Sequence, residues 1–204
     1  KAPTANEIIG LMGNTHKISN KVDDYLQTQS ELTTIEEFLS NWFSQISSFI
    51  FEQAQLHHQS NQLPSISSTS LTDSKTFSFA SHLTFTLDNF TNDPHQDKDV
   101  SPFSFGLWIP IHRKTGDIVE SNFQVHGGNF LFPQDWCGLN FEGFDGIVEL
   151  IWPANAMVHY TDSSTSSNGS FHDRLGISCE TPSKTLHTYQ KFLQGKYDEE
   201  KYFV

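Results

Sequence analysis

Two different hydrophobic periods divide the sequence, and they limit the possible folds more than any other feature. Between residues 35 and 50, large apolar side chains recur at spacings of three and four, which is the period of one helix face. From Lys75 onward they fall on alternate positions, as half-buried strands require. The alternating residues are Phe77, Phe79, Leu83, Phe85 and Leu87. The chain is therefore predicted to join an N-terminal helical layer to a β-rich remainder.

The helical segment has a recognisable start. Thr34-Ile35-Glu36-Glu37 has the form of a capping box, which predicts a helix beginning there. The apolar stripe that follows is wide enough to need a large packing partner, and a sheet is expected. It consists of Ile35, Phe38, Leu39, Trp42, Phe43, Ile46, Phe49 and Ile50. Shorter helical pieces are expected at residues 7–12 and 22–26.

The remaining segments predict one domain over residues 1–204. Further strand candidates are 103–111, 128–132, 146–151, 156–160 and 175–179. Many short strands with frequent turns favour a sandwich or jelly roll. The expected boundaries are a helical layer at 1–58, a Ser/Thr-rich surface loop at 59–74, a β core at 75–182 and a C-terminal helix or tail at 183–204.

The charge balance restricts the class of partner. The chain has 12 Lys and Arg against 24 Asp and Glu, a formal net charge of −12. Such an acidic protein cannot neutralise many phosphates, so nucleic-acid binding would have to use a local basic strip. Lys98, Arg113 and Lys114 are the candidates for that strip.

Compartment signals are few. The sequence has no apolar run long enough for a membrane span and no visible signal peptide, so no membrane partner is expected. Cys137 and Cys179 lack metal-binding spacing, which favours a reducing compartment, intracellular and either nuclear or cytoplasmic. Two glycosylation triplets, at Asn89 and Asn168, leave secretion open.

One short motif suggests a metal site. In an extended chain, His95 and Asp97 lie on the same side because residues i and i+2 share a face. His159, which follows an apolar run, supplies a third ligand. Two imidazoles and one carboxylate form the facial triad of non-haem Fe(II) oxygenases, which leaves positions for a co-substrate and O2. Alone, each of these residues could equally be an ordinary turn or core residue.

Arg174 is the candidate anchor for that co-substrate. It is one of only two arginines, and it precedes the strand candidate at 175–179. An Arg fork binds a carboxylate through two parallel hydrogen bonds, which suits the distal carboxylate of 2-oxoglutarate. A salt bridge with Asp173 or Asp162 is the alternative. Ser178, on the same segment, is a second candidate for the co-substrate site.

The order of these pieces resembles a known family. FTNDPHQDKDVSPFSFGLWIPI, GGNFLFP, VHYTD and HDRLGISCE occur in the order seen in Tet-like 2-oxoglutarate/Fe(II) oxygenase domains of the TET/JBP superfamily, particularly the fungal branch. The resemblance covers about residues 75–182. It implies a double-stranded β-helix, a cupin-like jelly roll. It also implies that His95, Asp97 and His159 bind iron and that Arg174 binds 2-oxoglutarate.

The function implied by the resemblance is hydroxylation of a C–H bond by a dioxygenase that uses Fe(II), 2-oxoglutarate and O2. The expected substrate is a methyl group of a modified nucleobase, such as 5-methylcytosine, in nucleic acid. A hydroxylase of a small molecule, amino acid or peptide is the first alternative, and a non-catalytic cupin-like barrel is the second. Expected substrate contacts are Phe90, Asn92, Trp108, Phe130, Lys98 and Arg113.

Overall fold

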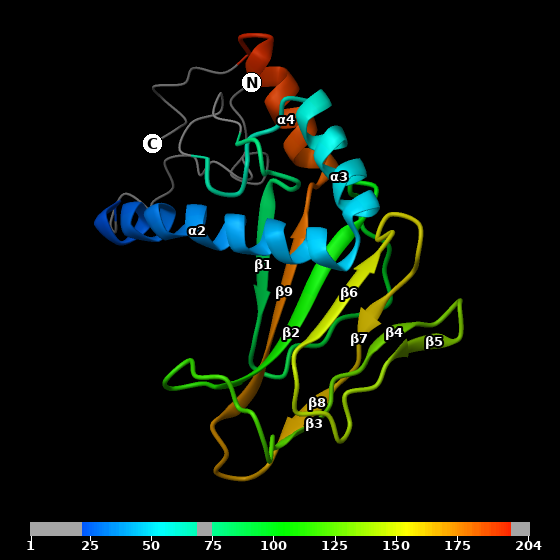
Figure 1. Cartoon of the computed structure of the whole chain (residues 1–204). Coiled ribbons are helices and arrows are strands. Elements are labelled where there is room, and N and C mark those ends of the chain that lie inside the picture. Colours follow the sequence, from blue (N-terminus) through cyan, green and yellow to red (C-terminus); the bar gives the residue numbers. More distant parts are fainter. Residues whose placement is uncertain (1–21, 69–74, 197–204) are drawn as a thin grey trace. The chain divides into compact units, whose positions relative to one another are not determined.

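The computed structural model describes residues 22–68 and 75–196, and these residues form two compact units. Unit 1 contains the helices and comprises residues 1–82, 99–102 and 180–204 as far as they are described; unit 2 contains the sheets and comprises 83–98 and 103–179 (Figure 1). The predicted helical piece at 7–12 lies outside the described residues.

The helix predicted to begin at Thr34 is longer than expected. The helix α2 spans Val22–Ile46, so Thr34 lies inside it and the predicted capping box is wrong. No Gly or Pro interrupts residues 22–46, and the two predicted helical pieces therefore form one helix. The helix α2 ends before Ser47. The Ser47 side chain accepts a hydrogen bond from the Ile50 amide and caps the next helix, α3, Ser48–Ser60. The C-terminal helix is α4, Ser183–Leu193.

The apolar stripe is buried only in part. Leu39 and Phe43 are buried, and the Phe43 ring makes edge-to-face contacts with Phe51 and Phe79. By contrast, Phe38 and Phe49 are 58% and 70% exposed. The expectation that the stripe packs against a large partner therefore does not hold for its outer half.

Residues 63–68 are buried, although their composition predicted part of a surface loop. The side chain of Glu36, which is also in unit 1, binds this segment. Its carboxylate accepts hydrogen bonds from the Ser67 amide at 2.9 Å, the Ser67 hydroxyl at 2.6 Å and the Ile66 amide at 3.3 Å. A polar segment can be buried when its donors meet such a carboxylate, and composition does not reveal that pairing.

Two histidines of unit 1, the buried His58 and the partly buried His82, predict a loss of stability in acid. Burial lowers the pKa of His58 and of His82 from 6.5 to about 4. In the described residues, His58 Nδ1 and His82 Nε2 have no hydrogen-bond partner. A pKa lowered by folding gives stability that is complete above pH 6.5 and is lost as the pH falls toward 4.

We therefore expect each histidine to cost about 2 kcal/mol of unfolding free energy at pH 5 relative to pH 7.5. Urea denaturation at both pH values measures this difference. His58→Gln and His82→Gln should each reduce the pH dependence, whereas the exposed His126→Gln should not. Equal pH dependence in all three variants would contradict the assignment.

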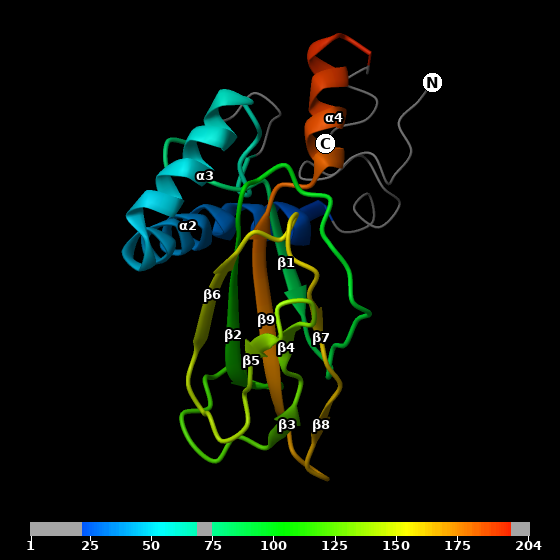
Figure 2. The same cartoon turned by 90° about the vertical axis from the view of Figure 1, so that its right-hand side faces the viewer.

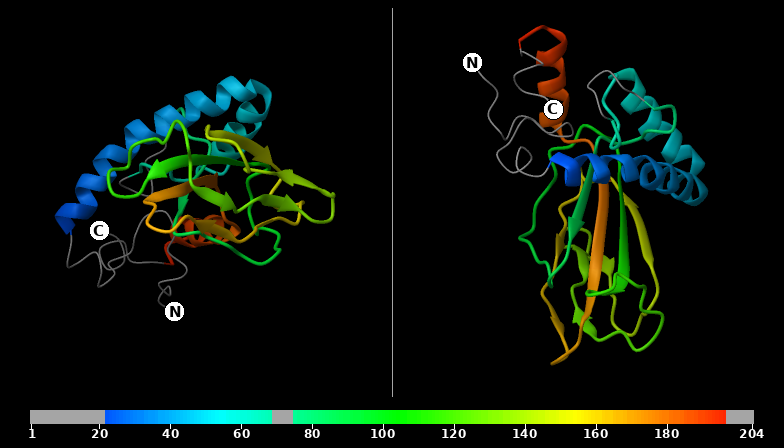
Figure 3. Two further views of the ribbon diagram at one scale, coloured as in Figure 1. Left: turned by 90° about the horizontal axis from the view of Figure 1, so that it is seen from below. Right: turned by 90° about the vertical axis from the view of Figure 1, so that its left-hand side faces the viewer.

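Unit 2 is built from antiparallel sheets. The largest has the strand order β1-β9-β2-β6, with β2 antiparallel to both β9 and β6. Two smaller sheets are β5-β4-β7 and β3-β8. The strands are β1 His82–Thr86, β2 Ser104–His112, β3 Val125–Gly127, β4 Phe130–Phe132, β5 Cys137–Leu139, β6 Val148–Trp152, β7 Tyr160–Thr161, β8 Ser164–Ser166 and β9 His172–Glu180. In Figure 3, β9 runs between β1 and β2.

The longer strands confirm the predictions at 103–111, 146–151 and 175–179, and β4 confirms part of 128–132. The pair Phe77 and Phe79 precedes β1 and is not a strand. Of the predicted strand 156–160, residues 156 and 157 form a turn, whereas His159 is bridged to His95 and Tyr160 begins β7. The strands β3, β5 and β8 were not predicted. Each has three residues, too few to show an alternating apolar pattern.

An aromatic layer joins the large sheet to β4. The Trp108 ring of β2 lies 4.9 Å from the Phe130 ring of β4, and the Trp152 ring of β6 lies 5.2 Å from it. Figure 2 shows the smaller strands in front of the large sheet. The residue Gly106 leaves room for this layer, because a Cβ there would lie 2.9 Å from the Trp152 ring. Closure into a double-stranded β-helix stays a prediction.

No helix in the described part of the chain is long and apolar enough to cross a membrane.

Candidate functional site

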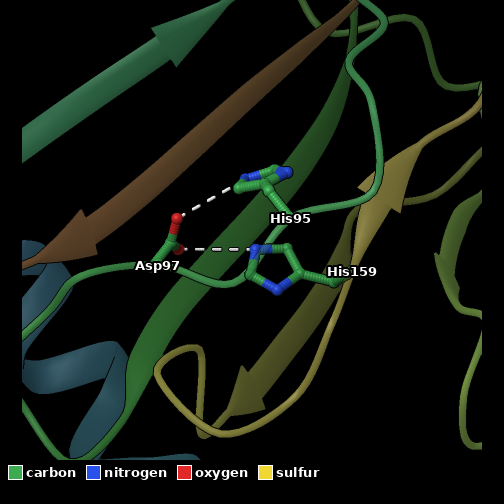
Figure 4. A group of neighbouring side chains, drawn as sticks. All are labelled: His95, Asp97 and His159. Carbon is green, nitrogen blue, oxygen red and sulfur yellow. Dashed lines mark ion pairs between the residues drawn. The ribbon is translucent and has the colours of Figure 1, made fainter.

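The three predicted metal ligands meet in unit 2. His95 Nε2 lies 3.4 Å from Asp97 Oδ1, and His159 Nε2 lies 3.4 Å from Asp97 Oδ2 (Figure 4). The two imidazole rings are 4.7 Å apart. One potential ligand atom from each residue lies within 4.8 Å of the others. The cluster is therefore compact enough to hold one metal ion.

Backbone pairing brings these residues together. The His95 amide donates to the His159 carbonyl at 3.0 Å, and the His159 amide donates to the His95 carbonyl at 2.8 Å. Directly opposed residues of an antiparallel pair share a face, and Asp97 shares it as residue i+2 of His95. The Asp97 amide also donates to the Ala154 carbonyl at 3.0 Å, which extends the pairing.

Hydrogen bonds to the far nitrogen of each ring orient both imidazoles. His95 Nδ1 lies 2.8 Å from the Asp93 carbonyl, and His159 Nδ1 lies 2.9 Å from the Met157 carbonyl. A carbonyl only accepts, so Nδ1 carries the proton in each neutral ring and the Nε2 lone pair faces Asp97. Three acceptor groups then converge, and a bound cation satisfies all of them. This donor set fits Fe(II).

The site is closed on one side and open on the other. The His159 residue is 3% exposed, and the rings of Phe130, Phe132 and Trp152 lie 5.4, 6.4 and 5.6 Å from its imidazole. The side chains of His95 and Asp97 are 39% and 32% exposed. Aromatic rings therefore exclude water behind the ligands, while substrate and O2 can reach the His95 side.

Arg174 lies on the inner face of the large sheet. Its register partner on β2 is Pro110, two residues from Trp108, so its side chain and that of Trp108 are on the same face. The guanidinium carbon lies 4.3 Å from the centre of the Phe141 ring, and Nη1 donates to the Gly127 carbonyl at 2.8 Å. Nη2 is buried and has no hydrogen-bond partner in the described residues.

That unpaired nitrogen fits an incoming carboxylate. Burial lowers the pKa of Arg174 to about 10, while the negative charges of Asp173 and Glu142 oppose the shift, so the side chain is still a cation at neutral pH. An unpaired buried donor on a cation is costly, and a carboxylate satisfies both its charge and its hydrogen bond. The backbone of Gly128 (φ +71°) lies close by, since a Cβ there would be 2.7 Å from Nη1.

A small hollow with a cavity volume of about 20 Å³ adjoins Arg174 and opens to solvent. Its lining residues are Thr86, Asn89, Phe90, Trp108, Gly128, Thr161, Ser164, Asp173 and Arg174. Thr161 lies two residues after His159 along the same extended segment and shares its face. The hollow and the three ligands are therefore neighbours. Sequence reasoning missed Thr86, Asn89, Thr161 and Ser164, because single polar residues in short strands and bends carry no distinctive pattern.

The expected salt bridge of Arg174 with Asp173 or Asp162 is not found among the described residues. The Asp173 carboxylate instead accepts from the Asp88 amide and pairs with Arg113 Nε at 3.2 Å. Arg113 Nη1 also pairs with Asp88 at 2.8 Å. Arg113 is thus bound to two carboxylates, which argues against its predicted role as a phosphate contact.

The other residues predicted to contact substrate or co-substrate lie in different places. Phe90 is 40% exposed and lines the hollow, whereas Trp108 and Phe130 belong to the aromatic core, with Trp108 also reaching the hollow. The Lys98 side chain is exposed. Ser178 lies opposite Gly106, on the same face of β9 as Arg174, but does not line the hollow.

Asn92 was expected to contact substrate, but the structure gives it a positioning role. Its Oδ1 accepts from the Thr161 amide at 2.7 Å, and its own amide donates to the Thr161 carbonyl at 3.2 Å. These bonds hold the segment that carries His95 against the segment that carries His159. We expect Asn92→Ala to weaken metal binding by about 10–100-fold, the usual cost of losing a group that orients ligands.

Co(II) titration, followed by the absorption of the bound ion, measures this effect. Asn92→Asp keeps the accepting oxygen and should lose less affinity than Asn92→Ala. An alanine variant with wild-type metal affinity and an unchanged Co(II) spectrum would remove Asn92 from this role.

The convergent acceptors fit a divalent metal, and the buried guanidinium fits a carboxylate-bearing co-substrate. The model of a family described as the Tet-like 2OG-Fe(II) oxygenase superfamily matches residues 1–164. The chain therefore belongs to this superfamily and is a 2-oxoglutarate/Fe(II) dioxygenase, with 2-oxoglutarate and O2 as co-substrates. The non-catalytic barrel is thereby excluded. No curated protein gives a significant match to the sequence.

The family model matches residues 1–164, whereas the resemblance seen in the sequence covers about residues 75–182. The match includes the N-terminal helices and all three predicted metal ligands, and it ends before Arg174. The assignment of Arg174 therefore depends on the geometry of the hollow.

Proposed function

We propose that this dioxygenase hydroxylates a methyl group of a modified nucleobase, such as 5-methylcytosine. His95, Asp97 and His159 hold the iron, and Arg174 binds the distal carboxylate of 2-oxoglutarate. The observation that carries the proposal is the convergence of two oriented Nε2 atoms and one carboxylate. When bound, Fe(II), 2-oxoglutarate and O2 together supply the oxidant, and succinate and CO2 are released.

The side chains of the protein position the reactants and exclude water. The Asp93 and Met157 carbonyls fix the imidazole rings, so little reorganisation accompanies metal binding. Arg174 holds the far end of the co-substrate through its buried Nη2, while Phe141 lies over the guanidinium. The aromatic rings around His159 keep bulk water away from that side of the metal site.

The choice of a nucleobase rests on the Tet-like family and on Phe90. This half-exposed ring at the hollow offers a stacking surface for a base that has left its helix. Stacking of this kind needs no large basic surface, which agrees with the net charge of −12.

A hydroxylase of a small molecule, amino acid or peptide is the second candidate. The pairing of Arg113 with Asp88 and Asp173 favours it, because Lys98 and Lys114 are then the remaining cations of the predicted phosphate-binding strip. With so few free cations, an oligonucleotide would be attracted only weakly.

Succinate formation separates the two candidates. The purified protein is supplied with Fe(II), 2-oxoglutarate and O2, together with free 5-methylcytidine or with a single-stranded oligonucleotide that carries 5-methylcytosine. The unmethylated nucleoside and oligonucleotide are the matched controls. We expect methylated substrates to raise the rate above the uncoupled rate, with a shallow dependence of oligonucleotide binding on salt.

The result also assigns the size of the substrate. Stimulation by the methylated nucleoside alone would retain the nucleobase and reject nucleic acid. If neither methylated compound stimulates succinate formation in a protein that binds Fe(II) and turns over 2-oxoglutarate, the nucleobase proposal is wrong and the small-molecule hydroxylase takes its place.

A further inference from the structure

One face of α2 carries a row of large apolar side chains, of which three are exposed and Trp42 is half-buried. The residues Ile35, Phe38, Trp42 and Ile46 recur at spacings of three and four and therefore share one side of the helix. Ile35, Phe38 and Ile46 are 38%, 58% and 42% exposed, and the Phe38 and Trp42 rings make an edge-to-face contact at 5.2 Å. These four residues are called the α2 outer face below.

The α2 outer face is separate from the side of the helix that packs in unit 1. That packed side contains Glu36, Leu39 and Phe43, all of which are buried. The helix therefore has one apolar side in the core and a second one exposed. Contiguous exposed apolar surface of this kind marks interaction sites in soluble proteins, and Trp and other aromatic residues often dominate the binding energy of such sites.

The charge around the α2 outer face restricts its partner. Residues 22–68 contain no Lys or Arg, and four of their acidic residues are exposed, namely Asp23, Glu31, Glu37 and Glu52. Glu31 lies one turn before Ile35 and is exposed. Anionic lipid, nucleic acid and a second copy of this acidic helix would all meet a surface of their own sign. A basic partner would not.

We propose that the α2 outer face binds an amphipathic helical segment of another protein, with apolar residues on one side and Lys or Arg beside them. The apolar side packs on Phe38, Trp42 and Ile46, and the basic residues lie near Glu31 and the other carboxylates. Helices that pack on one another use apolar residues at this spacing, and complementary charge selects the partner. This binding is independent of the proposed oxidation.

Three fluorescent peptides test the proposal. Each is a designed helix of about 18 residues, or five turns, with the same Leu and Phe side and with flanks of Lys, Gln or Glu. We expect the full-length protein to bind the Lys peptide most tightly and the Glu peptide at least about tenfold more weakly, as measured by fluorescence anisotropy. The preference should decrease at high salt.

Two kinds of variant locate the binding. Phe38→Gln combined with Ile46→Gln should weaken Lys-peptide binding by at least about tenfold, because it removes the central contacts. The matched control is Leu193→Gln, which changes a 54% exposed apolar residue of α4. Glu31→Lys should reduce the preference for the Lys peptide, and unchanged circular dichroism and thermal stability show that each variant is folded.

Three results would overturn the proposal. The first is equal affinity for all three peptides or no binding of any of them. The second is unchanged binding by the double variant. The third is a dimer of the wild-type protein, seen by light scattering, that the double variant fails to form; a second copy would then be the partner.

Discussion

The His159→Ala variant should lose turnover completely and bind Fe(II) more than about 100-fold more weakly than the wild type. Loss of a group that only orients a ligand costs about 10–100-fold, and loss of a ligand costs more. His159 is also the most buried of the three ligands, so solvent cannot readily replace its imidazole. Anaerobic Fe(II) titration and the iron content of the purified protein measure the effect.

A matched control separates metal loss from unfolding. His126 is another histidine of unit 2; its side chain is 57% exposed and pairs with Glu142. His126→Ala should retain one iron per chain and full turnover. Unchanged iron content in His159→Ala, with circular dichroism like that of the wild type, would reject the triad and with it the proposed site.

The Arg174→Ala variant should raise the Michaelis constant for 2-oxoglutarate by about 100-fold, because a charge-assisted pair with a buried carboxylate is lost. Its metal affinity should stay at the wild-type value, because the guanidinium faces the hollow and is not a ligand. Steady-state kinetics at varied 2-oxoglutarate and a parallel Co(II) titration measure the two quantities.

The conservative variant sharpens the Arg174 prediction. Arg174→Lys keeps the charge but loses the fork, so it should be impaired as well, though less than alanine. Lys98→Ala removes an exposed cation that directly follows the metal ligand candidate Asp97 in the sequence. This variant should leave the Michaelis constant for 2-oxoglutarate unchanged. Wild-type kinetics in Arg174→Ala would place the co-substrate anchor elsewhere.

The part of the site that could be predicted is the part formed by residues close together in the sequence. The shared face of His95 and Asp97 follows from their spacing in an extended segment. Their meeting with His159 depends on backbone pairing between distant segments, and the resemblance to the family supplied that step. The role of Asn92 could not be predicted, because a side chain that accepts from a distant amide looks the same in sequence as a solvated turn residue.

The parts of the fold that could be predicted are those in which the pattern of apolar residues extends over many positions. The helical layer and the longest strands have clear patterns, whereas the Thr34 capping box matched by chance inside a continuous helix. The burial of residues 63–68 depends on one carboxylate, that of Glu36, about thirty positions earlier in the chain. The ion pairs of Arg113 could not be predicted for a similar reason, since its partners Asp88 and Asp173 are its neighbours only in the folded chain.

The reciprocal backbone bonds between His95 and His159 make local opening of the chain depend on metal supply. The segment 87–98 contains no strand and joins residues 154–161 through these bonds and those of Asn92 and Asp97. An ion held by both histidines must leave before the two segments separate. At an ion concentration of 100 times its dissociation constant, opening costs about 2.7 kcal/mol more, a roughly 100-fold slowing of amide hydrogen exchange at His95 and His159. The segment 87–98 should therefore be cleaved by proteases more readily in metal-free protein than in metal-loaded protein.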